Sequence, residues 1–300
     1  MNDEVYDFPP FRPPSEAESL LVRVTRGCPW NRCTFCPMYK GVKFETRTAE
    51  AVMADIDTAG TFTNGRVKTV FIGDSDSLVS TRRTICGVMD QLYAKFPAVE
   101  RVTSYARAQT LRRKSVEALV AIRAAGLTRL HIGLETGSEY LLKRIQKGAG
   151  PETMVSGVNK AKQAGFEISL YVLLGIGGVA DSFHHAVETA ALINRMAPDY
   201  VRVRTLAPQP DTGLYEQWQQ GEFELPGPEV ILREQRCLID RLDVRCEYLS
   251  DHVSNYVPVN GKLPVDKPAM ISMLDDTLER LSGDEAFKKR LDRMPYLRRL

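Results

Sequence analysis

The chain has 300 residues, of which 43% are hydrophobic and 26% are charged, and its formal net charge is only +2. These values are typical of a globular protein, and so small a net charge creates no strong field for nucleic acid. No apolar run approaches the roughly 20 residues of a membrane-spanning helix, and the acidic N-terminus lacks the apolar core of a signal peptide, so we expect a cytoplasmic protein without a membrane partner.

Short apolar runs alternate with longer amphipathic stretches from residue 20 onward, which predicts β/α units and a parallel sheet. The expected strands are Leu20–Thr25, Val67–Ile72, Val102–Tyr105, Thr128–Leu134, Ile168–Leu174 and Tyr200–Leu206. The expected helices are Thr48–Ala59, Thr81–Phe96, Ser115–Ala125, Glu139–Ile145, Pro151–Ala164 and Asp181–Met196.

Six strand–helix repeats in about 190 residues predict an α/β fold, namely a partial (β/α)6 barrel of TIM type, because a full eight-stranded barrel takes about 250 residues. A doubly wound open sheet is the alternative, and periodicity alone does not exclude it. Residues 1–19 are rich in proline and read as an extended arm, and residues 20–215 form the core. Residues 216–300 read as a mostly helical extension with one candidate strand, Val244–Leu249.

The most informative segment directly follows the first expected strand, where Cys28, Cys33 and Cys36 lie within nine residues. Three thiolates on one short loop can hold three corners of a 4Fe–4S cluster and leave the fourth iron open for a small ligand. A vacant ligand position is typical of catalytic metal sites, whereas structural sites are closed. The alternatives are a zinc site that lacks its fourth ligand, or buried thiols.

This loop resembles that of the radical S-adenosylmethionine (SAM) superfamily, in which three cysteines hold a 4Fe–4S cluster and SAM chelates the unique iron. The commonest spacing in that superfamily is Cys-x3-Cys-x2-Cys, whereas four residues separate Cys28 from Cys33 here. A flexible loop can absorb one extra residue. The resemblance also implies that Phe35 flanks SAM.

The fourth expected strand ends in a second informative segment, which begins Gly133-Leu-Glu135-Thr-Gly-Ser and ends at Lys147-Gly. It is similar to a string found in the radical SAM branch of methylthiotransferases, the elongator catalytic subunit and oxygen-independent coproporphyrinogen oxidase. The resemblance implies that Glu135 binds the ribose hydroxyls or the amine of SAM. His131 shares a strand face with Glu135, and it either points to the same interior or is a buried, hydrogen-bonded histidine.

Two glycine segments lie at the ends of other strands, where parallel α/β folds bind their ligands. The resemblance makes Gly73, with Asp74 or Asp76, the turn that takes the SAM ammonium group; an acidic cap for the next helix is the alternative. It likewise makes the backbone of a second segment the contact to adenine, where missing side chains allow close approach. That segment consists of Gly175, Ile176 and Gly177, and the acid that often follows it is missing, the nearest being Asp181.

Arg202 and Arg204 share one face of the sixth expected strand. Because a parallel strand is normally apolar, paired arginines need anionic partners. One arginine could hold the SAM carboxylate and the other a substrate acid, or both could pair with carboxylates on neighbouring strands. In the polar segment that follows near residue 250, His252 and Asn255 are candidates for a substrate lid or a capped turn. Cys86, Cys237 and Cys246 are expected to be structural thiols.

The resemblance implies that the reduced cluster cleaves SAM to methionine and a 5′-deoxyadenosyl radical, which abstracts hydrogen from the substrate. No catalytic residue is assigned beyond those that bind the cluster and SAM. The near-neutral charge and the two strand arginines favour a small, acidic substrate, and the expected protein partner is an electron donor such as flavodoxin or ferredoxin. The alternatives are an RNA-modifying radical SAM enzyme, with nucleic acid as a disfavoured partner, and a non-catalytic iron–sulfur redox sensor or zinc scaffold.

Overall fold

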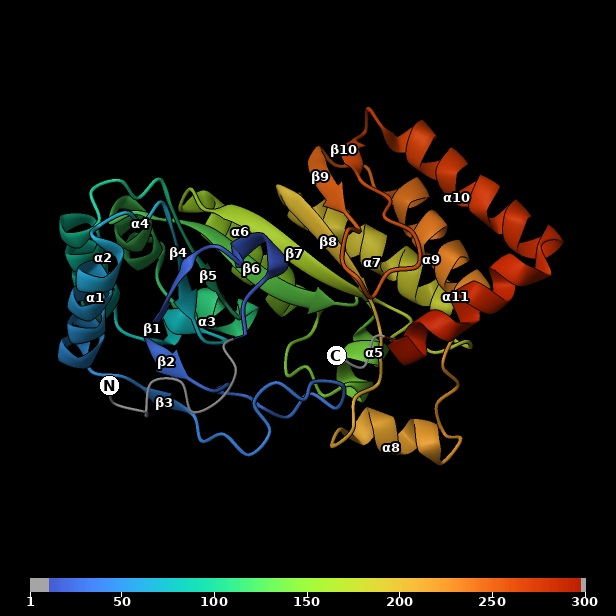
Figure 1. Cartoon of the computed structure of the whole chain (residues 1–300), viewed down its shortest axis with the longest axis horizontal. Helices are drawn as coiled ribbons and strands as arrows, with labels where there is room; N and C mark the ends of the chain where they lie inside the picture. The colour runs from blue at the N-terminus through green and yellow to red at the C-terminus, as the bar shows by residue number, and fades with distance from the viewer. Residues whose placement is uncertain (1–10, 298–300) are drawn as a thin grey trace. The chain divides into compact units, whose positions relative to one another are not determined.

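The structure is a computed structural model that describes residues 11–297, without the side chains of residues 294–297 (Figure 1). Residues 1–10 of the predicted arm and residues 298–300 of the predicted extension lie outside this range. The chain divides into two compact units. The first comprises Met1–Asn31, Met38–Ile132 and Ser156–Glu167, and the second comprises Arg32–Pro37, Gly133–Val155 and Ile168–Leu300.

The first unit is built on parallel strands in the order β1 (Leu20–Arg23), β4 (Thr69–Gly73), β5 (Arg101–Tyr105) and β6 (Leu127–Glu135), whose last three residues belong to the second unit. A short antiparallel pair joins β2 (Thr25–Arg26) to β3 (Glu45–Thr46). The helical segments are η2 (Pro14–Glu16), η3 (Ser77–Val79), α1 (Ala49–Thr63), α2 (Arg82–Lys95), α3 (Ala108–Arg113), α4 (Val116–Ala124) and most of α6 (Pro151–Gln163).

Hydroxyl caps start three of these helices. The side chains of Thr48, Thr81 and Ser115 accept backbone N–H groups in the first turns of α1, α2 and α4, which satisfies donors that have no partner within a helix. Helices α1 and α2 pack side by side (Figure 1). The core between strands and helices consists of fully buried apolar side chains, among them Val70, Phe71, Val102, Ile56, Ile85, Met89 and Leu119.

The strands of the second unit are the end of β6, β7 (Glu167–Leu174), β8 (Tyr200–Thr205), β9 (Cys246–Leu249) and β10 (Gly261–Leu263). Strand β8 pairs in parallel with both β7 and β9, and β10 pairs with β9 in the antiparallel direction. Its helices are α5 (Glu139–Arg144), α7 (Ser182–Met196), α8 (Gly213–Gln219), α9 (Pro228–Arg241), α10 (Lys267–Gly283) and α11 (Glu285–Leu297). Helix α9 packs against both α7 and α10 (Figure 1).

The predicted α/β fold class is confirmed. All six predicted core strands and six helices form, and within each unit the strands follow chain order without the reversal that marks a doubly wound sheet. Two details were wrong. The first strand ends at Arg23, because Thr25 turns away to pair with Thr46, and the extension contains a second strand, β10, whose three residues are too few to show a period. The division into arm, core and extension stays a prediction.

None of the described helices combines the length and the apolar character that crossing a membrane requires.

Candidate active site

The cysteine loop begins in the first unit, where the turn after β4 fixes it. The backbone N–H of Gly27 donates to Asp74 Oδ2 (2.9 Å), and the Ser75 hydroxyl donates to the Gly27 carbonyl (3.0 Å). Cys28 follows, half-buried, with its Sγ 3.4 Å from the backbone N–H of Asn31. The residue before Cys28 is therefore held by the end of β4, where Gly73 is buried.

Asp74 is engaged inside the protein. Its side chain is 1% exposed, and Oδ1 lies 3.1 Å from Nε of Arg23, which is equally buried. Burial raises the pKa of Asp74, and the Arg23 guanidinium opposes this shift. With Oδ2 accepting from Gly27, both carboxylate oxygens have partners. The prediction that Asp74 takes the SAM ammonium group therefore finds no support in these contacts.

Asp76 is similarly occupied. It is completely buried, accepts the Thr110 hydroxyl (2.6 Å) and the backbone N–H of Arg107 (3.3 Å), and so anchors the start of α3. Burial raises its pKa to about 6, although Thr110 and Arg107 act in the opposite direction. It is not the cap of the next long helix, since Thr81 caps α2. The Arg107 guanidinium lies over the Trp30 ring at 5.4 Å.

His131 is a buried, partnered histidine rather than a residue with a free ring. Its Nε2 lies 3.4 Å from Oε1 of Glu16, and both side chains are 0% exposed. Ser19 donates to the same carboxylate and Arg101 lies 3.3 Å from it. Burial alone would raise the pKa of Glu16, but hydrogen bonds from His131 and Ser19 and the charge of Arg101 outweigh it and lower the pKa to about 2.

This group predicts a pH dependence of stability. A carboxyl whose pKa falls from 4.5 in the unfolded chain to about 2 in the folded one stabilises the folded state above pH 4.5, and this contribution is lost as the pH falls toward 2. We expect Glu16→Gln to lower the free energy of unfolding at pH 7 by about 3 kcal/mol. Urea unfolding of both proteins should show this difference shrinking by more than half by about pH 3; a difference independent of pH would contradict the prediction.

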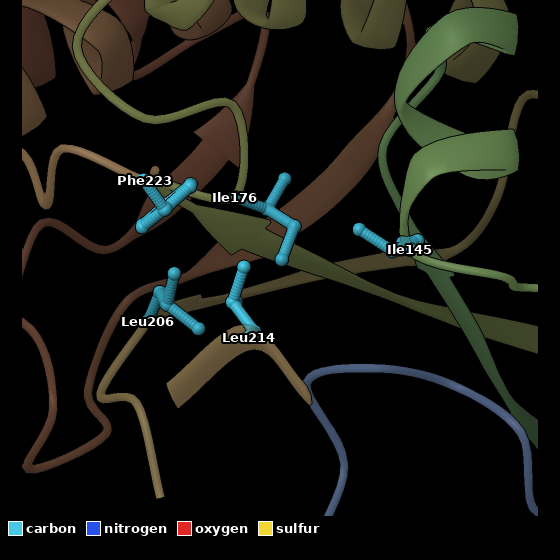
Figure 2. Close-up of a cluster of buried hydrophobic side chains, with 5 residues drawn as sticks. All are labelled: Ile145, Ile176, Leu206, Leu214 and Phe223. Carbon is cyan, nitrogen blue, oxygen red and sulfur yellow. The ribbon is translucent and has the colours of Figure 1, made fainter. Parts of the chain in front are cut away.

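The other two cysteines of the loop lie in the second unit, where backbone hydrogen bonds hold the segment Cys33–Cys36. The N–H of Thr34 donates to the carbonyl of Ile145 (3.0 Å), and the N–H of Leu214 donates to the carbonyl of Thr34 (2.9 Å). Ile145 and Leu214 belong to a buried cluster with Ile176, Leu206 and Phe223 (Figure 2). Phe35 packs against the same cluster. The segment is thus fixed by residues that lie far from it in sequence.

Glu135 forms an ion pair with Lys147 at the end of β6. Nζ of Lys147 lies 2.7 Å from Oε1 of Glu135, with 16% and 14% of the two side chains exposed. Glu135 has a φ of 66°, which is uncommon for a residue with a side chain and often marks a functional position. A Cβ at Gly133 would collide with the Glu135 carboxylate and lie 2.8 Å from Nζ of Lys147, so glycine leaves the room that the pair occupies.

Lys147 connects this pair to the cysteine segment. Its Nζ lies 6.0 Å from the centre of the Phe35 ring. Burial would lower the pKa of Lys147, but the negative charges of Glu135, Cys33 and Cys36 together raise it. The second unit therefore brings Cys33, Phe35 and Cys36 close to the Glu135–Lys147 pair. The sequence predicts no role for Lys147, although it lies in the same string as Glu135. A cation in the same string as a strand-end acid is the pattern that could have predicted this ion pair.

The glycine segment after β7 is shaped by distant residues of the same unit. Gly175 has a φ of 80°, and its N–H donates to Oε1 of Glu234 on α9 (2.7 Å). Ile176 is buried in the cluster of Figure 2. Gly177 approaches the backbone of Asp181, whose carboxylate lies 3.8 Å from Arg144. Asp181 is therefore close to the segment.

Arg202 and Arg204 share one face of β8, as predicted, while Val201, Val203 and Thr205 are buried on the other. No carboxylate among the described residues of the second unit pairs with either guanidinium. Each instead lies over a tyrosine ring, Arg202 over Tyr200 (5.9 Å) and Arg204 over Tyr171 (5.1 Å). The alternative that neighbouring strands neutralise both arginines is therefore wrong.

The polar segment near residue 250 forms a structured turn over the end of β8. The Asn255 side chain accepts the Thr205 hydroxyl (3.0 Å) and donates to the Val203 carbonyl (2.8 Å). Ser254 accepts the N–H of Thr205 (3.0 Å), and His252 contacts Ser254 (2.8 Å). These bonds favour the interpretation of His252 and Asn255 as parts of a capped turn.

No disulfide links any of the six cysteines. Cys237 and Cys246 are buried, and burial raises the pKa of Cys246 to about 12, which keeps it a neutral thiol. Cys86 is half-buried. Among the described residues, no three His, Cys, Asp or Glu side chains converge on a point where one metal ion could bind. A 4Fe–4S cluster makes a different demand, because each thiolate binds a separate iron.

A sequence profile of the Radical SAM superfamily matches residues 22–190. The chain belongs to the radical SAM superfamily.

Two relatives illustrate the similarity. The heme chaperone HemW of Bacillus subtilis (strain 168) is 26% identical over 165 residues, which cover 54% of this chain and 43% of HemW. The solved coproporphyrinogen III oxidase HemN of Escherichia coli, described as a radical SAM enzyme, superimposes with a TM-score of 0.57 and 20% identity over 74% of this chain and 52% of HemN. This radical SAM protein thus spans about half the length of the relatives it matches.

A third comparison is the radical SAM methyltransferase TsrM of Kitasatospora setae, solved with cobalamin and a 4Fe–4S cluster, with a TM-score of 0.52 and 18% identity over 70% of this chain and 41% of TsrM. Members of the superfamily bind a 4Fe–4S cluster and SAM, so both predicted cofactors are confirmed at the level of the family. The donor set of this radical SAM protein fits such a cluster, because its loop offers three half-buried thiols that form no disulfide.

Proposed function

We propose that this chain is a radical SAM enzyme in which Cys28, Cys33 and Cys36 hold the cluster and which acts on a small acidic substrate. The observation that carries the proposal is the group of Cys33, Phe35 and Cys36 with the Glu135–Lys147 pair. It places a loop with thiolates, an aromatic ring and an ion pair at one strand end, which combines groups for a metal cluster with groups for a zwitterionic ligand.

Several residues of the chain are proposed to bind SAM. Glu135 takes a ribose hydroxyl or the amine, and Phe35 flanks the ligand. The backbone of Gly175, Ile176 and Gly177 lies against adenine, and the turn at Gly73 contributes backbone groups. Because the carboxylates of Asp74 and Asp76 are engaged within the protein, we propose that they shape this turn and do not contact SAM.

When bound, the reduced cluster and SAM supply a 5′-deoxyadenosyl radical that abstracts hydrogen from the substrate. The chain's own residues orient SAM, keep water away and hold charge. Lys147 offers a positive charge beside Cys33 and Cys36, which suits residues that bind metal as thiolates. The electron comes from an external donor, for which flavodoxin or ferredoxin is proposed.

The acidic substrate is proposed from the face of β8. Arg202 is aligned with Tyr171 on β7, and its Nε is buried without a hydrogen-bond partner. The hydroxyl of Ser169, on the same face of β7, is also buried without one. A buried donor without a hydrogen-bond partner destabilises the folded state unless a ligand supplies the missing acceptor. Since Arg204 lies nearer the carboxyl end of β8, we propose that it binds the SAM carboxylate and that Arg202 binds the substrate acid.

An assay of SAM cleavage tests this assignment. The anaerobic, dithionite-reduced protein is given SAM together with one of three additions: a mixture of small carboxylic acids, the methyl esters of the same acids, or RNA. The 5′-deoxyadenosine that forms is then measured. We expect stimulation by the free acids alone. In Arg202→Gln the affinity for the stimulating acid should fall by roughly tenfold or more, as expected for a lost charge-assisted bond, while SAM affinity stays within about twofold.

The matched control is Arg195→Gln, which removes an exposed arginine of α7 that pairs with Glu152. It should behave as the unmodified protein. Equal stimulation by the esters would contradict an acidic substrate, and stimulation by RNA alone would identify an RNA-modifying enzyme. A protein that binds a cluster but never cleaves SAM would be a sensor or electron carrier.

A further inference from the structure

A carboxylic acid is buried on the inner face of α9, where most of the other buried residues of the helix are apolar. Glu234 is 2% exposed, and its neighbours on the buried side of the helix include Ile231, Leu238 and Ile239. Burying such a group is costly unless hydrogen bonds compensate it. An apolar residue would fill the same space without that cost, so the groups that the carboxyl contacts should indicate its role.

Glu234 contacts the glycine segment directly. Its Oε1 accepts the N–H of Gly175 (2.7 Å), the first residue after β7, and its Oε2 accepts the hydroxyl of Ser182 at the start of α7. A Cβ at Gly175 would lie 2.8 Å from Cδ1 of Ile231, one helical turn before Glu234. Helix α9 therefore packs closely against this segment and also accepts a hydrogen bond from its backbone.

The same carboxyl group faces a histidine that reaches the end of β6. Nε2 of His185 lies 3.4 Å from Oε1 of Glu234, and both side chains are 0% exposed. On the other side of the ring, Nδ1 lies 2.9 Å from the hydroxyl of Thr136, the residue after Glu135. Thr189, one turn along α7, accepts the N–H of Gly137 (2.8 Å). A buried row of polar groups thus runs from Gly175 to the Glu135 turn, in which the His185–Glu234 contact is a close approach and not a hydrogen bond.

We propose that Glu234 is a positioning residue for SAM, which fixes the Gly175 segment directly and the Glu135 turn through His185. The inference rests on the proposed assignment of both segments to SAM. Glu234 lies outside the residues that match the superfamily profile, 22–190. The region beyond the profile therefore supplies the acid that aligns two ligand-binding segments within it, and it does so across 59 residues of sequence.

The protonation states guide the choice of variants. Burial raises the pKa of Glu234 to about 8, against the hydrogen bonds from Ser182 and Gly175, and burial lowers the pKa of His185 to about 3. Both side chains are then neutral at pH 7. Glutamine is a close substitute for a neutral glutamic acid, since its oxygen can accept from Gly175 and its amide can donate to the Ser182 oxygen once that hydroxyl, which donates to Oε2 in the structure, rotates. Leucine keeps the volume but removes both contacts.

The test compares Glu234→Leu, Glu234→Gln and Glu229→Leu in the anaerobically reconstituted full chain. Glu229 is the matched control, an exposed acid on the same helix. We expect Glu234→Leu to weaken SAM binding roughly tenfold or more with unchanged iron content, because the binding segments lose their preorganisation. Glu234→Gln should stay within about threefold and Glu229→Leu within about twofold of the unmodified protein.

Amide hydrogen exchange without SAM gives a second readout that needs no turnover. Faster exchange confined to residues 173–180 and 134–138 in Glu234→Leu, restored in Glu234→Gln, supports positioning. If Glu234→Leu does not fold, Ser182→Ala removes a single partner of the carboxyl group and should weaken SAM binding by about threefold.

The inference is overturned if Glu234→Leu with an intact cluster binds SAM within about twofold of the unmodified protein. It is also overturned if exchange rises across the whole second unit and Glu234→Gln fails equally, since that describes general destabilisation. An unmodified protein that holds a cluster but does not bind SAM would refute the proposed function instead, so the two failures are distinguishable.

Discussion

Replacing Cys33 with alanine should abolish the iron–sulfur cluster. The loop offers three thiolates, and two remaining ligands cannot retain a 4Fe–4S cluster against loss to solvent and chelators. The iron content after anaerobic reconstitution is expected to fall from about four atoms per chain to nearly none. Iron analysis and the visible absorbance of the cluster measure this directly.

The matched control is Cys86→Ala, which removes a half-buried thiol from α2, outside the loop. It should keep the full iron content. Retention of about four irons in Cys33→Ala, with their loss in Cys86→Ala, would contradict the proposed ligand set.

Asp74→Ala is expected to lower the free energy of unfolding by about 3–5 kcal/mol, the cost of removing one partner from a buried ion pair. The Arg23 side chain is 1% exposed and would keep its buried charge after losing the Asp74 carboxylate. The N–H of Gly27, which precedes the first cysteine, would lose its acceptor as well. Urea unfolding at neutral pH, followed by circular dichroism, measures the change.

The double variant Arg23→Met with Asp74→Leu distinguishes the lost partner from the lost packing. Because it buries no charge, it should be more stable than Asp74→Ala. A change of less than about 1 kcal/mol in Asp74→Ala would show that the pair does not stabilise the first unit.

The residues that the sequence identified best are those whose chemistry is local. The three cysteines lie within nine residues, and Glu135 ends a strand whose apolar pattern is plain, so their types and spacing were enough to predict their place in the fold. Gly133 and Lys147 belong to the same string, and their contact with Glu135 became visible only in the structure.

Other roles depend on partners that no local pattern indicates. Asp74 looks like a free acid at a glycine turn until Arg23 and Gly27 are seen to occupy its two oxygens. Glu234 looks like one more acid of an amphipathic helix, yet its partner Gly175 lies 59 residues away. Such pairings are set by how strands and helices pack, which periodicity does not encode.

The central claim is that SAM binds to an iron of a cluster held by the cysteine loop. Electron paramagnetic resonance of the anaerobically reconstituted, dithionite-reduced protein, recorded with and without SAM, tests it most directly. We predict a 4Fe–4S signal that changes when SAM is added. A cluster signal that ignores SAM would contradict the claim, and so would the absence of any cluster together with tightly bound zinc.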